Sequence, residues 1–162
     1  MDIWSETKEC HKLPDFLVIG PQKTGTTALY RFLQIHPGIQ SNYNSDTTFE
    51  EIQFFSNADF YAQGIDWYMD FFPSRKESNH SFLLFEKSAT YFDKDMAPKR
   101  ASRLLKNAKL VVILISPVKR AYSWYQHMRA HNEPTSLENS FYQIISSPNN
   151  ASTKSVKSLQ SR

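Results

Sequence analysis

Cysteine and long apolar runs are scarce in this chain of 162 residues. The single cysteine, Cys10, excludes an internal disulfide, a cysteine metal cluster and a redox pair. No apolar run approaches the roughly 20 residues needed to cross a bilayer, and residues 1–12 have neither a hydrophobic signal region nor an Arg-rich amphipathic pattern. The chain is long enough for one domain with a core and too short for two ordinary ones.

An excess of charge is missing as well. The sequence has 19 Lys and Arg against 16 Asp and Glu, a formal net charge of +3. This balance lacks the basic excess typical of nucleic-acid binding, so we expect no nucleic-acid partner. Two Asn-x-Ser sequons, beginning at Asn79 and Asn150, would matter only in a secretory lumen.

Strand and helix patterns alternate along the chain. Apolar runs predict strands at 16–19, 82–88 and 109–116, and helical spacing predicts helices from Thr26, within 64–73, over 96–108 and over 117–131. Alternation of this kind implies right-handed crossovers and a parallel sheet, hence a three-layer α/β/α fold.

Ligands of such a fold collect beyond the carboxyl ends of the strands, here after Ile19, Phe85 and Ile115. We expect one domain over 13–147, an N-terminal extension over 1–12 and a polar tail over 148–162.

The stretch GPQKTGTT, from Gly20 to Thr27, follows the first predicted strand and opens a predicted helix. In this position the backbone N–H groups of Thr24–Thr27 lie at a helix N-terminus and favour a phosphate or sulfate. A Walker A loop would place lysine where Thr26 stands, whereas here Lys23 precedes the second glycine. A nucleoside triphosphate is therefore the poorer interpretation, and a plain turn with a surface lysine remains open.

Polar residues also follow the last predicted strand. Ser123, His127 and His131 are spaced by four, so on a helix they share one face. Two histidines at this spacing can bind zinc, but a third ligand and the glutamate of a His-Glu-x-x-His motif are missing, so we expect no metal. Surface histidines and residues that grip an anionic polymer remain equal alternatives.

Five ordered segments together resemble the sulfotransferase domain of heparan sulfate N-deacetylase/N-sulfotransferases. They are LPDFLVIGPQKTGTTALYRFLQIHP (13–37), TFEEIQFF (48–55), GIDWYMDFFP (64–73), FEKSATYFD (85–93) and RAYSWYQHMRAH (120–131). The resemblance implies transfer of a sulfuryl group from 3′-phosphoadenosine 5′-phosphosulfate to the amino group of glucosamine in the heparan sulfate or heparin precursor polysaccharide. It implies no metal cofactor.

The resemblance also assigns roles to residues. Lys23 matches the family's essential loop lysine, which stabilises charge on the leaving phosphate. Glu51 matches the proposed general base, while Glu50 does not match and is expected to point elsewhere. The remaining assignments are Thr24, Gly25, Thr26, Thr27 and Ser123 for cofactor binding, and Lys87, Trp124, His127 and His131 for substrate binding.

The family's domain continues past Arg162 and is preceded by a deacetylase domain and a membrane anchor, so we expect this chain to be a fragment. By resemblance the full protein would be a type II membrane protein acting in the Golgi lumen, with no direct membrane contact from this segment. An inactive or binding-only remnant of such an enzyme is the main alternative. A small-molecule P-loop kinase is disfavoured by the displaced lysine and by the lack of an aspartate suitable for magnesium.

Overall fold

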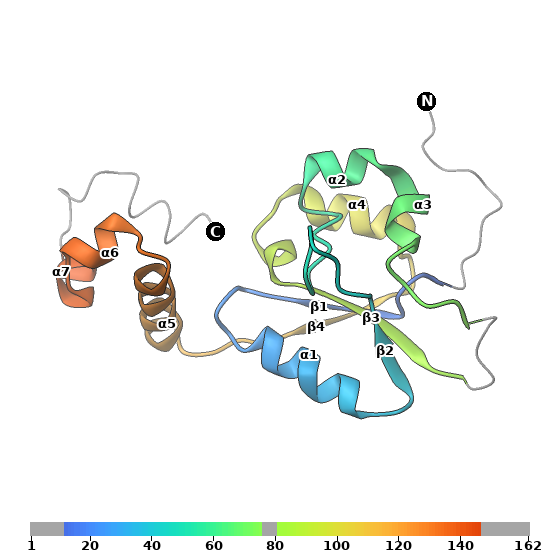
Figure 1. The fold of residues 1–162 in the computed structure, drawn as a ribbon, viewed down its shortest axis with the longest axis horizontal. Coiled ribbons are helices and arrows are strands. Elements are labelled where there is room, and N and C mark those ends of the chain that lie inside the picture. Colours follow the sequence, from blue (N-terminus) through green and yellow to red (C-terminus); the bar gives the residue numbers. More distant parts are fainter. Residues whose placement is uncertain (1–11, 76–80, 147–162) are drawn as a thin grey trace. The chain divides into compact units, whose positions relative to one another are not determined.

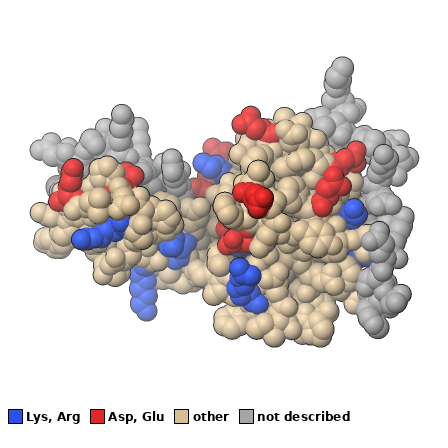
Figure 2. All heavy atoms as spheres, in the orientation of Figure 1, with Lys and Arg blue, Asp and Glu red and all other residues tan. Residues whose placement is uncertain are grey.

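The structure is a computed structural model that describes residues 12–75 and 81–146. The chain divides into two compact units, Met1–Ile113 and Leu114–Arg162. In the described ranges no helix is both long enough and apolar enough to cross a membrane. Figure 2 shows side chains of both charge signs scattered among neutral residues on the face drawn, in keeping with the small net charge.

Several features of the sequence fall outside the described residues. These are Cys10, both sequons, the predicted tail over 148–162 and nearly all of the predicted extension over 1–12. The domain boundaries proposed from the sequence therefore stay predictions.

The first unit is built on a four-stranded sheet in the order β2-β3-β1-β4. Every neighbouring pair is parallel, which confirms the expectation from the alternating pattern. The strands are β1 (Phe16–Ile19), β2 (Ile39–Ser41), β3 (Leu83–Ser88) and β4 (Lys109–Val112).

Helices cover both faces of this sheet, and the first unit therefore has three layers (Figure 1). One face carries α1 (Thr26–Ile35), and the opposite face carries α2 (Ala58–Ala62), α3 (Gly64–Met69) and α4 (Met96–Leu104). A short 3-10 helix, η3 (Ala89–Phe92), directly follows β3. The predicted three-layer α/β/α fold is confirmed.

One strand was not predicted, and one predicted strand is shorter than expected. Strand β2 lies inside a stretch that reads as a polar loop, because three residues are too few to show an alternating pattern. Strand β4 ends at Val112 although the apolar run continues to Ile115. An apolar run records which residues can be buried, whereas the strand ends where its hydrogen-bonded partner β1 ends, and Val112 is paired with Ile19.

Strand pleating divides the core into two clusters. Leu17 and Leu84 belong to the larger cluster, with Phe54, Tyr68 and other buried residues on the side of α3 and α4. Their neighbours Val18 and Phe85 point the opposite way and pack with Tyr30 of α1. Successive strand residues alternate between faces, so both helical layers are held by the same two central strands.

In its described part, residues 114–146, the second unit contains three helices. They are α5 (Pro117–Ala130), α6 (Pro134–Glu138) and α7 (Phe141–Ser146). A proline occupies the first position of α5 and of α6, where its missing N–H is not needed. The rings of Tyr122 and Phe141 meet edge to face at 5.2 Å, which ties α5 to α7. The predicted helix over 117–131 is confirmed by α5.

Candidate active site

The carboxyl ends of β1 and β3 lie side by side at one edge of the sheet. The parallel register pairs Val18 with Lys87 and Ile19 with Ser88. Glu86, Lys87 and Ser88 are the last three residues of β3, as the predicted strand over 82–88 implied, so the strand's carboxyl end lies after Ser88 and not after Phe85. Pleating therefore sends Lys87 toward α1 and sends Glu86 and Ser88 toward the opposite face.

A tight turn leads from β1 into α1. A Cβ atom added to Gly20 would lie 2.3 Å from the backbone oxygen of Ala89, so only glycine fits against the start of η3. Gly25 has φ 102°, a conformation that glycine adopts without strain. Lys23 has φ 67°, which is uncommon for a residue with a side chain and recurs at functional sites.

The start of α1 offers donors that no side chain caps. Gly25 is the N-cap residue and supplies no capping group, and the first turn contains no acidic residue. Thr24 Oγ1 instead donates to the carbonyl of Pro21 at 2.8 Å, inside the turn. Within residues 12–75 and 81–146 the ammonium of Lys23 has no hydrogen bond or ion pair. An uncapped helix N-terminus beside a free ammonium suits an anion.

The ammonium of Lys87 contacts side chains from three positions at this edge of the sheet. Its side chain is fully buried, and Nζ lies 2.7 Å from Glu51 Oε1 and 3.2 Å from Glu50 Oε1. Nζ also lies 3.5 Å from Thr27 Oγ1, at the start of α1. A buried ammonium is stable only beside opposite charge and hydrogen-bond acceptors, and these contacts supply both.

Glu50 does not point away from Glu51, and that expectation is wrong. Both carboxylates contact Lys87, and Thr27 Oγ1 lies 3.4 Å from Glu50 Oε1. The segment is an irregular turn with φ 50° at Phe49, so consecutive side chains need not diverge as they do on a strand. Burial alone would raise the pKa of Glu50, but the charge of Lys87 and its hydrogen bond hold that pKa below its ordinary value.

Glu51 is oriented through both of its oxygens. Oε1 accepts from Lys87, and Oε2 accepts from the backbone N–H of Ala89 at 3.2 Å. About a fifth of the Glu51 side chain remains exposed, 20% against 0% for Lys87. The carboxylate is thus fixed in place at the sheet edge and still open to a ligand.

Glu86 is a polar centre that the sequence interpretation missed. It is fully buried and accepts hydrogen bonds from Tyr68, Tyr91 and Ser88. Burial raises the pKa of Glu86 to about 7, although these three hydrogen bonds act in the opposite direction. The signal that could have indicated this centre is a charged residue, Glu86, directly after the apolar run 82–85 and still within the predicted strand over 82–88.

The remaining predicted residues lie on α5 and at its C-cap, His131, in the second unit. The ring centroids of His127 and His131 are 4.2 Å apart, and those of Trp124 and His127 are 5.4 Å apart. Trp124 Nε1 is buried without a hydrogen-bond partner among the described residues. Ser123 lies on the same helix. That Ser123 and Lys23 bind the same cofactor stays a prediction.

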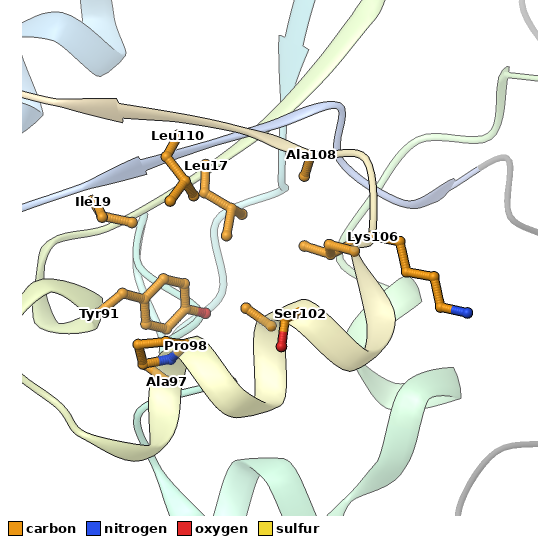
Figure 3. Close-up of a pocket in the computed structure, with 11 residues that line it drawn as sticks. Leu17, Ile19, Tyr91, Ala97, Pro98, Ser102, Lys106, Ala108 and Leu110 are labelled. Carbon is orange, nitrogen blue, oxygen red and sulfur yellow. The ribbon is translucent and has the colours of Figure 1, made fainter.

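The described residues contain no group of three or more His, Cys, Asp or Glu side chains arranged for a metal. An apolar cavity of about 330 Å³ lies between the sheet and α4 (Figure 3). Leu17, Ile19 and Leu110 line it from the strands, and Ala97 and Pro98 line it from α4. None of the predicted site residues lines this cavity, and its apolar wall does not suit an anion.

Comparisons with known proteins point to one family. The family model described as "Sulfotransferase domain" matches residues 13–156. The chain is 55% identical over 161 residues to bifunctional heparan sulfate N-deacetylase/N-sulfotransferase 2 of Mus musculus. It is 57% identical over 161 residues to bifunctional heparan sulfate N-deacetylase/N-sulfotransferase 3 of Homo sapiens. It is 54% identical over 170 residues to the bifunctional heparan sulfate N-deacetylase/N-sulfotransferase of Drosophila melanogaster.

These alignments cover 99% of this chain but only 18% of the mouse and human proteins and 16% of the fly protein. A crystal structure of a sulfotransferase from Alicyclobacillus acidocaldarius has the same fold, with a TM-score of 0.64 and 26% sequence identity. That match covers 83% of this chain and 56% of the bacterial chain.

Proposed function

Because the chain belongs to the sulfotransferase domain family, we propose that it carries the donor loop and the general base of a heparan sulfate N-sulfotransferase. The donor is 3′-phosphoadenosine 5′-phosphosulfate. The acceptor is the amino group of glucosamine in the heparan sulfate or heparin precursor polysaccharide.

The observation that carries this proposal is the position of the Lys87 ammonium between the two halves of the site. Nζ contacts Glu51, the candidate base, and lies 3.5 Å from Thr27 at the start of α1. The base and the anion-binding loop are therefore linked through one buried side chain. A transfer reaction needs the donor, held by the loop, to lie close to the acceptor, activated by the base, and Lys87 keeps these two parts of the site together.

The chemistry follows from these groups. Glu51 takes a proton from the acceptor ammonium, and the freed amine attacks sulfur in line with the bond to the leaving phosphate. The nitrogen–sulfur bond forms while the sulfur–oxygen bond breaks, and negative charge collects on the phosphate oxygen. The nitrogen releases its second proton to solvent, which leaves the N-sulfate. Lys23 and the backbone N–H groups at the start of α1 stabilise that charge as it develops.

The other groups bind the two substrates. Thr24, Gly25, Thr26 and Thr27 hold the phosphosulfate, and Ser123 contacts the 3′-phosphate. Trp124, His127 and His131 present a row of rings on α5 that suits a sugar chain. Lys87, which the resemblance assigns to the acceptor side, also holds Glu51 in place.

The test is sulfate transfer to N-deacetylated heparan sulfate by the 162-residue chain. Glu51→Gln keeps size and polarity but removes the base, so the rate should fall by roughly two to four orders of magnitude with donor affinity little changed. Lys23→Ala removes charge stabilisation and should lower the rate about a hundredfold or more. Asp59→Asn on α2 and Lys99→Ala on α4 are matched controls, since both residues are exposed, and neither should change the rate.

Nucleotide binding separates the alternatives. Adenosine 3′,5′-bisphosphate should raise the melting temperature more than ATP, since only the former presents a 3′-phosphate to Ser123. Binding without transfer would favour the inactive or binding-only remnant. A larger shift with ATP and magnesium would favour the P-loop kinase and contradict the proposal.

The resemblance also leads us to propose that the protein acts in the Golgi lumen. Expression in animal cells followed by glycosidase treatment and mass spectrometry would detect N-linked glycan at Asn79 or Asn150. Localisation of the protein to the cytosol would contradict this proposal.

A further inference from the structure

The segment that carries Glu51 is held by two hydroxyl groups. The backbone N–H of Gln53 donates to Ser88 Oγ at 3.0 Å, and the backbone N–H of Phe55 donates to the Tyr91 hydroxyl at 3.3 Å. These two contacts come from the end of β3 and from η3. They fix the main chain within four residues of Glu51.

One buried carboxylate sets the direction of both hydroxyls. Ser88 Oγ donates to Glu86 Oε1 at 2.8 Å, and the Tyr91 hydroxyl donates to the same oxygen at 2.5 Å. A hydroxyl has a single proton, so donating it to Glu86 leaves only its lone pairs to face the amides of Gln53 and Phe55. The second carboxylate oxygen accepts from Tyr68, which makes no hydrogen bond to this segment among the described residues.

The held segment needs such support. Gln53 has φ 57°, a left-handed conformation that is strained in a residue with a side chain and persists when the surroundings determine it. Ile52, Phe54 and Phe55 are fully buried, so the segment is also anchored by packing. Packing alone leaves the direction of the main chain less defined than two hydrogen bonds from a rigid strand end.

We propose that Glu86 is a positioning residue that acts through Ser88 and Tyr91 to hold the segment carrying Glu51. Glu86 does not touch the substrates; this role rests on the proposed function of Glu51 as the base. The charged and titratable groups that face Glu86 are Tyr68 on α3, Tyr91 on η3 and, more distantly, Glu51. Lys87 is the next residue of β3 and points to the other face.

Two tyrosine variants form a matched pair. Both hydroxyls donate to Glu86, and both side chains are buried, so each change to phenylalanine removes one hydrogen bond to the same carboxyl group. Only Tyr91 also accepts from the segment. A purely structural role of the cluster would give both variants the same effect, whereas a positioning role would distinguish them.

Amide hydrogen exchange on the 162-residue chain, measured by NMR, tests the inference without substrate. Tyr91→Phe should speed exchange of the Phe55 amide at least about tenfold relative to Val18 in β1, and Tyr68→Phe should not. Glu86→Gln should speed exchange of both Gln53 and Phe55. Equal exchange at Phe55 in the two tyrosine variants would overturn the inference, even if Glu86→Gln does not fold.

Kinetics supply the second readout. Tyr91→Phe should lower kcat at least about fivefold more than Tyr68→Phe, with the KM for the donor unchanged, because the base is displaced and the loop is not. Equal losses of kcat would contradict a positioning role. If the wild-type chain transfers no sulfate, the proposed function fails, and the exchange measurement still decides whether Glu86 holds the segment.

Discussion

Replacing Glu86 by glutamine should change how the stability of the protein depends on pH. Burial raises the pKa of Glu86 to about 7 in the folded chain, against an ordinary value of 4.5. The folded state therefore holds the proton of Glu86 more tightly than the unfolded state between these values. The contribution of Glu86 to the free energy of unfolding is most favourable below pH 4.5 and decreases as the pH rises through this window.

The size of the effect follows from the shift. The two pKa values differ by 7 − 4.5 = 2.5 pH units, and at about 1.4 kcal/mol for each unit the full effect is about 3 kcal/mol. About 2.5 kcal/mol of this falls between pH 5 and pH 8. Glutamine does not titrate, so Glu86→Gln lacks this loss of stability.

The assay is urea unfolding of the wild type and of Glu86→Gln across pH 5 to 8, followed by circular dichroism. The wild type should lose about 2.5 kcal/mol relative to the variant over this range. Glu50→Gln is the control, because the pKa of Glu50 is lowered and its window lies below pH 4.5. A difference between wild type and Glu86→Gln that does not change with pH would refute the reasoning.

Two further changes test the packing of the site. Lys87→Met removes the ammonium between Glu50 and Glu51 and should lower the free energy of unfolding by about 2–3 kcal/mol. This is less than the usual cost of breaking a fully buried ion pair, because both carboxylates are partly exposed. A free energy of unfolding in urea equal to that of the wild type would contradict this prediction. Gly20→Ala forces a Cβ atom to within 2.3 Å of the Ala89 carbonyl oxygen and should cost about 1–3 kcal/mol. A melting temperature equal to that of the wild type would contradict this prediction, because it would mean that the turn accommodates the added Cβ atom without strain.

Local patterns were enough to predict the frame of the site. The branched run at 16–19, the glycines at 20 and 25 and the helical spacing after Thr26 specify strand, turn and helix without distant contacts. The parallel sheet followed from alternation, because a helix between two strands carries the chain back along the sheet, so the next strand runs in the same direction as the one before it. Strand β2 was not predicted, because its three residues, Ile39–Ser41, are too few to show a period.

The sequence alone determined that a glycine-containing turn leads from a buried strand into a helix N-terminus, since that depends on neighbours along the chain. Only the tertiary structure decided that Glu50 and Glu51 meet on Lys87 and that Glu86 gathers Ser88, Tyr68 and Tyr91. Those contacts join residues up to 37 positions apart. They depend on which face of β3 each side chain occupies and on how an irregular turn crosses the strand's end, and no local pattern records either.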